Sequence, residues 1–197
     1  THVMRINTFH ARDDAYYVHT FGAFYWALEG HKAPKGQEEY WPQPDFLMDL
    51  EKDDLPLGMR FFEYKETGSV DKYHESALLI DVGDYTLLCS ADMVQNIIDT
   101  THCSMLGSFV TWAMGFIGPA SIGMGIRMLL KWPDDDLCCQ RQLGRLCELK
   151  FDYLTTAHGL AITDGTAHEQ VEAGVRRVLN PSYHKWPRHR NLTVLAL

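Results

Sequence analysis

The chain has 197 residues, of which 46% are hydrophobic and 12% aromatic, so it can form one domain with a packed core and is not a disordered polymer. Its formal net charge of −8 argues against nucleic acid as a partner, because the phosphate backbone would repel it. The five cysteines follow neither a disulfide framework nor a zinc-ribbon spacing, and no apolar leader is visible, so the sequence predicts a cytoplasmic protein with reduced thiols.

The first residues predict a strand, then a helix from about residue 13 to residue 21 that ends at Gly22, then a strand over 23–28. This order is typical of a parallel α/β unit. Residues 32–58 contain four prolines and many charges, and they predict a long surface excursion with little regular structure.

Residues 59–92 predict β structure. One strand is expected at 59–65, and two more, at 76–82 and 85–90, are joined by a Gly-Asp hairpin turn. The last of these apolar runs stops just before Asp92. A carboxylate at the end of a buried strand indicates either a functional site at the sheet edge or a turn or helix-cap residue.

No charged residue occurs over residues 103–126. The length would suit a membrane span, but five glycines and Pro119 argue against a transmembrane helix, because lipid cannot satisfy a broken backbone. The segment predicts a buried helix at about 105–114 followed by a glycine-rich loop, or an exposed apolar surface for a protein partner, a second subunit or an oily ligand. We expect it to be covered, either by the domain or by a second subunit.

A helix is predicted at 133–149, followed by a strand at 151–156 that leads to His158. His158 is a metal ligand or acid–base group at a sheet edge, or a loop histidine with local hydrogen bonds. A further helix is predicted to open at Thr166, with Glu169 completing a capping box. Residues after this helix, 181–197 with their basic cluster, are interpreted as a C-terminal tail.

Four segments resemble the metallo-β-lactamase-like fold family. Residues 6–23 look like the stretch with its His-x-His-x-Asp-His motif, and residues 68–80 like the loop that supplies its third histidine. Residues 86–92 and 151–159 resemble the strands that end in its metal-bridging aspartate and its last histidine. The resemblance implies a single α/β domain built as an αββα sandwich, with the strands that normally precede the first motif missing or built another way.

The first motif departs from the family pattern. Its metal-binding positions fall on Asn7, Phe9, Ala11 and Arg12, and neither Phe9 nor Ala11 can bind a metal, while Arg12 would repel one. A slip in this register would bring other polar side chains into range, namely His10, Asp13 and Asp14.

Two positions, Asp92 and His158, match the family well, while the third-histidine position falls on Asp71 with His74 close by. The first interpretation is a non-catalytic or binding relative with an eroded metal site and a small-molecule ligand. The alternative is a metal-dependent hydrolase of an ester, thioester or amide, in which Asp92 and His158 hold a metal-activated water, helped by Asp71, His74 and either His10 or Asp14. Zinc or another divalent metal and a metal-free site are equally compatible with these residues. Whether the chain is an enzyme stays open at this point.

Overall fold

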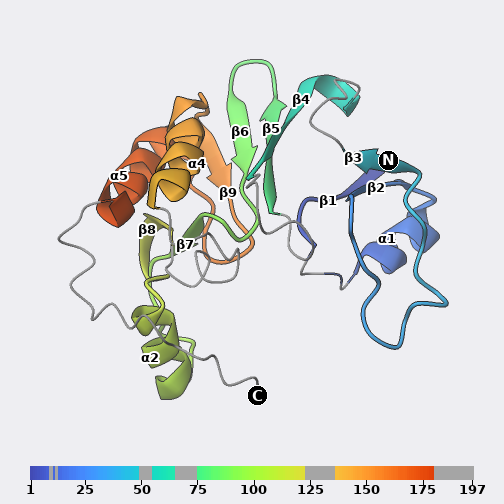
Figure 1. The fold of residues 1–197 in the computed structure, drawn as a ribbon, viewed down its shortest axis with the longest axis horizontal. Helices are drawn as coiled ribbons and strands as arrows, with labels where there is room; N and C mark the ends of the chain where they lie inside the picture. The colour runs from blue at the N-terminus through green and yellow to red at the C-terminus, as the bar shows by residue number, and fades with distance from the viewer. Residues whose placement is uncertain (9–10, 12, 49–54, 65–74, 123–135, 180–197) are drawn as a thin grey trace.

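In a computed structural model of the chain, the structure describes residues 1–8, 11, 13–48, 55–64, 75–122 and 136–179. These residues form a mixed α/β fold with three small sheets (Figure 1). One group of elements contains β1 to β3 and α1, and the other contains β4 to β9 with the remaining helices. The predicted α/β class is therefore confirmed at this level.

The first sheet is parallel and has the strand order β1-β2-β3. Its strands are β1 (His2–Arg5), β2 (Phe24–Leu28) and β3 (Phe46–Met48), and helix α1 (Asp14–Phe21) connects the first two. The helix ends at Gly22, which adopts the left-handed conformation with φ 56°. The predicted parallel strand–helix–strand unit is confirmed.

Strand β3 corrects one prediction, because it lies inside the 32–58 segment that was expected to lack regular structure. It pairs with β2, and its Phe46 ring stacks on Trp26 with a centroid separation of 4.3 Å. A strand of three residues is too short to produce a recognisable period, so only the partner strand identifies it.

The second sheet has the order β4-β5-β6-β9. It is preceded by a short 3-10 turn, η1 (Pro56–Gly58), and comprises β4 (Met59–Glu63), β5 (Ser76–Asp81), β6 (Thr86–Cys89) and β9 (Tyr153–Thr155). The first three strands are antiparallel, which confirms the predicted hairpin, and β9 joins parallel to β6. A third sheet pairs β7 (Gln95–Ile97) with β8 (Gly118–Ser121).

The main core lies between the second sheet and two helices, α4 (Asp136–Glu148) and α5 (Ala167–Leu179). Neighbouring residues of β4 serve two cores: Phe62 packs into this main core, whereas Phe61 packs against a second cluster around Trp26 of the first sheet. The helix predicted from Thr166 is present, but the Thr166 backbone N–H, which Glu169 would accept in the predicted capping box, donates instead to Asp164 at 3.1 Å.

Helix α2 (Met105–Ala113) confirms the helix predicted near 105–114, and because none of its residues is buried, it matches the predicted exposed apolar surface and not the alternative of a buried helix. Ser104 caps it by accepting a hydrogen bond from the Gly107 amide. Within the described ranges, the structure contains no helix whose length and apolar content would let it cross a membrane. Residues 123–126 and the 181–197 tail lie outside the described residues.

Candidate functional site

Asp92 and His158 lie side by side, with 3.1 Å between Oδ1 of Asp92 and Nε2 of His158. This confirms their predicted proximity. The pairing of β6 with β9 brings them together, because parallel strands end at the same sheet edge. The pairing continues beyond the strands through a hydrogen bond from the Ala157 amide to the Ala91 carbonyl at 2.9 Å. The Asp92 side chain is 9% exposed and that of His158 is 50% exposed, so solvent reaches the pair from the histidine side.

The backbone around His158 is held tightly by Asn96. The backbone N–H of Asn96 donates to the backbone carbonyl of His158 at 3.1 Å, and the backbone N–H of Leu160 donates to the backbone carbonyl of Asn96 at 3.0 Å. Gly159, at φ +100°, lies between these two bonds, and a Cβ there would come within 2.1 Å of the Asn96 carbonyl oxygen. Only glycine fits this close approach, which fixes where His158 leaves the strand.

Asn7 and Glu75, which join the first sheet to the second, both hydrogen-bond to Asp92. Asn7 donates a long hydrogen bond from Nδ2 to Oδ2 of Asp92 at 3.4 Å, and Glu75 accepts from the Asp92 amide at 2.8 Å. Asn7 and Glu75 also form an isolated antiparallel bridge that joins the first sheet to the second. Glu75 is 1% exposed, and burial raises its pKa well above the usual value, which favours the protonated form of its carboxyl.

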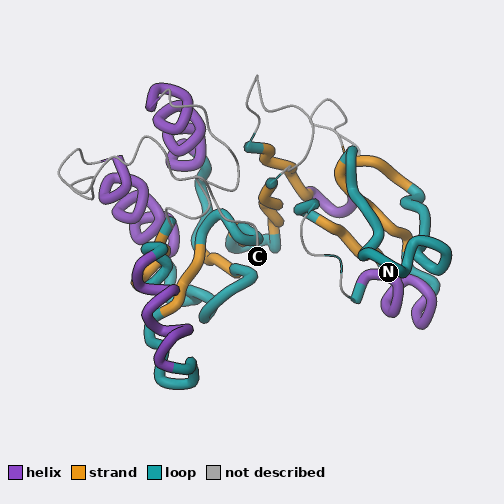
Figure 2. The backbone as a smooth tube through the Cα atoms, turned by 60° about the horizontal axis from the view of Figure 1, so that its bottom comes forward, coloured by secondary structure: helices purple, strands orange, loops and turns teal. Residues whose placement is uncertain are grey.

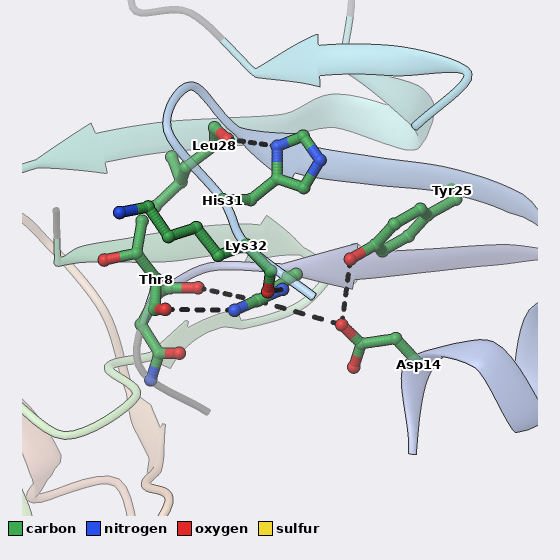
Figure 3. Close-up of polar contacts among 8 residues, drawn as sticks. Thr8, Asp14, Tyr25, Leu28, His31 and Lys32 are labelled. Carbon is green, nitrogen blue, oxygen red and sulfur yellow. Dashed lines mark hydrogen bonds and ion pairs between the residues drawn. The ribbon is translucent and has the colours of Figure 1, made fainter. Parts of the chain in front are cut away.

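A polar network surrounds Asp14 (Figure 3). The Tyr25 hydroxyl donates to Oδ2 of Asp14 at 2.9 Å, and Nε of the buried Arg5 lies 3.8 Å from the same oxygen. The Arg5 guanidinium also donates to three backbone carbonyls, those of Asn7, Thr8 and Lys32. Burial raises the pKa of Asp14 above its ordinary value, although the hydrogen bond from Tyr25 opposes the shift. The carboxyl group of Asp14 therefore already has two partners, the Tyr25 hydroxyl and the Arg5 guanidinium.

A cavity of about 660 Å³ extends from His158 to Asp14. Its apolar walls are Met4, Ile6, Ala11, Cys89, Ala91 and Ala157. Its polar lining is Arg5, Asn7, Asp14, Thr155, Thr156 and His158. Burial raises the pKa of Cys89 to about 11, so its thiol is neutral at pH 7 and contributes an apolar surface, not a thiolate nucleophile.

The described residues supply only part of the predicted metal-ligand set. Asp92 and His158 come together, Asp14 lines the same cavity with partners of its own, and three further candidates lie outside the described residues: His10, Asp71 and His74. Within the described part of the chain, no three His, Cys, Asp or Glu residues are placed to hold a metal ion. A hydrolytic metal centre needs about three protein ligands, so the residues described do not by themselves fit one.

Sequence reasoning missed the buried polar residues that support the site. Charged residues that follow apolar strands were taken as site candidates only for β6 and β9. Arg5 is the last residue of β1, and Glu75 directly precedes β5, so both are charged residues at a strand terminus. Considering strand starts as well would have identified Glu75.

No protein-family model matches the chain, and no curated protein is significantly similar to it. The resemblance to the metallo-β-lactamase-like family therefore rests on the sequence segments described above.

Proposed function

We propose that this chain is a metallo-β-lactamase-like protein with an eroded metal site, which binds a small organic molecule in the cavity beside His158. The observation that carries the proposal is the Asn7 contact. In the family register Asn7 takes the position of the first metal-binding histidine, and here its amide donates to Asp92. A protein donor thus occupies one oxygen of the carboxylate that resembles the metal-bridging aspartate.

The order of layers supports the αββα sandwich in this proposal. Helices α4 and α5 cover one face of the second sheet, and Phe61 of β4 contacts the cluster of Trp26 and Leu28 on the first sheet. Tyr25, whose side chain alternates with Trp26 along β2, bonds to Asp14 at the start of α1. These contacts favour a succession of helices, sheet, sheet and helix, and Asp92 bonds to Asn7 and Glu75, which bridge the two sheets.

The lining of the cavity favours a compact, neutral ligand with both apolar and polar groups. Half of the lining residues are apolar, while Thr155, Thr156 and His158 add polar groups at one end. The guanidinium of Arg5 is already bonded to backbone carbonyls and paired with Asp14, so it does not provide a site for an anionic ligand.

Binding of small organic fragments, measured by ligand-observed NMR, tests this proposal. Ala157 lines the cavity, so Ala157→Trp should fill it and weaken binding of every cavity-directed fragment at least about tenfold, since ~1.4 kcal/mol of lost contact suffices. The matched control is Ala161→Trp, at an exposed alanine outside the lining. Absence of any fragment binding to the wild type, or equal binding to both variants, would contradict the proposal.

One observation favours the metal-dependent hydrolase of an ester, thioester or amide as the second candidate. The 3.1 Å between Asp92 and His158 is close to the ~3.3 Å separation of two tetrahedral ligands on one zinc ion, so the pair is compatible with a shared metal. Elemental analysis and thermal unfolding with zinc or manganese separate the candidates. The eroded site predicts no bound metal and an unchanged Tm. Bound metal, with a rise in Tm that His158→Ala abolishes and the exposed-site control His102→Ala retains, would establish the second candidate instead.

A further inference from the structure

Helix α2 exposes apolar side chains to solvent, whereas an ordinary surface helix exposes polar ones. Its large apolar side chains face outward, with exposed fractions of 91% for Met105, 72% for Leu106, 59% for Phe109, 49% for Val110 and 58% for Trp112. Its polar residues are only partly exposed: the Ser108 hydroxyl donates to the Thr100 carbonyl at 3.4 Å, and the Thr111 hydroxyl donates to the Gly107 carbonyl within the helix. A surface helix normally presents the opposite arrangement, so this outward face, named here the α2 face, indicates an interaction surface.

We propose that the α2 face is a homodimer interface, at which α2 of one copy packs against α2 of a second copy. The helix projects from β7 and β8 away from the second sheet and from α4 and α5 (Figure 1), and it stays at the lower edge when the molecule is turned by 60° (Figure 2). A second molecule can therefore reach the α2 face without displacing any described element.

The spacing of the apolar residues suits packing of one helix on another. Met105, Phe109 and Trp112 are separated by four and three residues, and Leu106 and Val110 form a parallel row beside them. Such rows are the ridges that fit into the grooves of a facing helix. Two copies related by a two-fold axis present the same rows to each other, which is the self-complementary contact that a dimer requires.

The exposed apolar area reaches the lower limit of what a specific dimer interface buries. Whole aromatic side chains present ~150–250 Å² each, so at 59% and 58% exposure Phe109 and Trp112 together leave roughly 200–300 Å² in solvent. With Met105, Leu106 and Val110 the α2 face offers on the order of 500 Å² per copy. Two copies then bury about 1,000 Å², which reaches the size expected of a specific interface.

Charge favours a second copy over a membrane surface. Two molecules of net charge −8 repel each other, and the repulsion is weakest when they meet through an uncharged face, because their charges then lie farthest apart; residues 103–126 contain no charged residue. Helices that lie in a membrane interface usually carry lysine or arginine on their polar side to attract anionic lipids, and α2 has none.

The test is the molar mass in solution, measured by light scattering during size-exclusion chromatography, of the wild type and of Met105→Glu/Leu106→Glu/Phe109→Glu. Two of the three substitutions fall in the first turn of α2, where acidic side chains stabilise a helix, so the variant keeps the helix while losing the apolar face. We expect a dimer for the wild type and a monomer for the variant, with the dissociation constant raised by on the order of 100-fold. Circular dichroism of both proteins verifies that the fold is retained.

The matched control is Val82→Glu, which replaces another exposed apolar residue at the hairpin between β5 and β6. This control should remain a dimer. A monomeric wild type at all accessible concentrations overturns the proposal, as does a folded triple variant that stays dimeric. Sedimentation of a monomeric wild type with phosphatidylcholine vesicles, lost in the triple variant, would identify lipid as the occupant and would equally overturn it.

Discussion

Replacing Gly159 with alanine should destabilise the protein by more than the cost of placing a residue with a side chain at a positive φ. The new Cβ would lie 2.1 Å from the Asn96 carbonyl oxygen and 2.8 Å from the Ile97 amide nitrogen, whereas ordinary contacts lie at 3.4–4 Å. The strand end and Asn96 must separate by more than about 1 Å to restore normal van der Waals contact. That movement breaks the hydrogen bonds from Asn96 to the His158 carbonyl and from Leu160 to the Asn96 carbonyl.

The expected loss in the free energy of unfolding combines two contributions. A residue with a side chain at φ +100° costs about 1–2 kcal/mol, and two broken hydrogen bonds cost about 1 kcal/mol each, which gives a total of about 3–4 kcal/mol. This is a large share of the 5–15 kcal/mol that typically stabilises a domain. Urea unfolding at pH 7, followed by tryptophan fluorescence and circular dichroism, measures the change.

Gly165→Ala is the matched control, because Gly165 also has a positive φ, +81°, but no atom lies within 4 Å of its added Cβ. It should lose only the conformational part, about 1–2 kcal/mol. Equal losses for the two variants would refute the reasoning, since they would show that the close approach between Gly159 and Asn96 contributes nothing to stability.

Two further predictions concern the packing of α5 and the buried carboxyl of the site. Gly174→Ala should lower the free energy of urea unfolding by about 2 kcal/mol, because its Cβ would lie 2.2 Å from the Ala120 carbonyl oxygen. The control Gly144→Ala in α4 meets no atom within 4 Å and should raise the free energy of unfolding by about 0.5–1 kcal/mol. A stabilised Gly174→Ala would contradict the close packing of α5 on Ala120. Burial raises the pKa of Glu75 well above 4.5, so the folded state keeps a proton that the unfolded chain releases, and stability falls as pH rises above that value. Glu75→Gln removes this dependence, so its stability relative to the wild type should rise as the pH increases above 4.5 in metal-free buffer. The exposed-site control Glu29→Gln should keep the wild-type slope, and parallel curves for Glu75→Gln and the wild type would contradict the raised pKa of Glu75.

Local features were predictable because their causes lie within a few residues. The hairpin between β5 and β6 follows from the Gly83-Asp84 turn, and α1 ends where Gly22 adopts the left-handed conformation. The proximity of Asp92 and His158 was also predictable, since both follow apolar strands and parallel neighbours end at one sheet edge. In contrast, β3 has only three residues and is recognisable only through its pairing with β2.

The sequence by itself thus determined the strand–helix–strand unit, the hairpin and the two polar strand ends. Tertiary structure decided what surrounds Asp92, because Asn7 lies 85 residues away along the chain and Glu75 lies 17 residues away, and no local pattern specifies such contacts. It also decided the direction of α2. Periodicity shows that the apolar residues of a helix share one face, but only the position of the rest of the protein determines whether that face points inward or toward solvent.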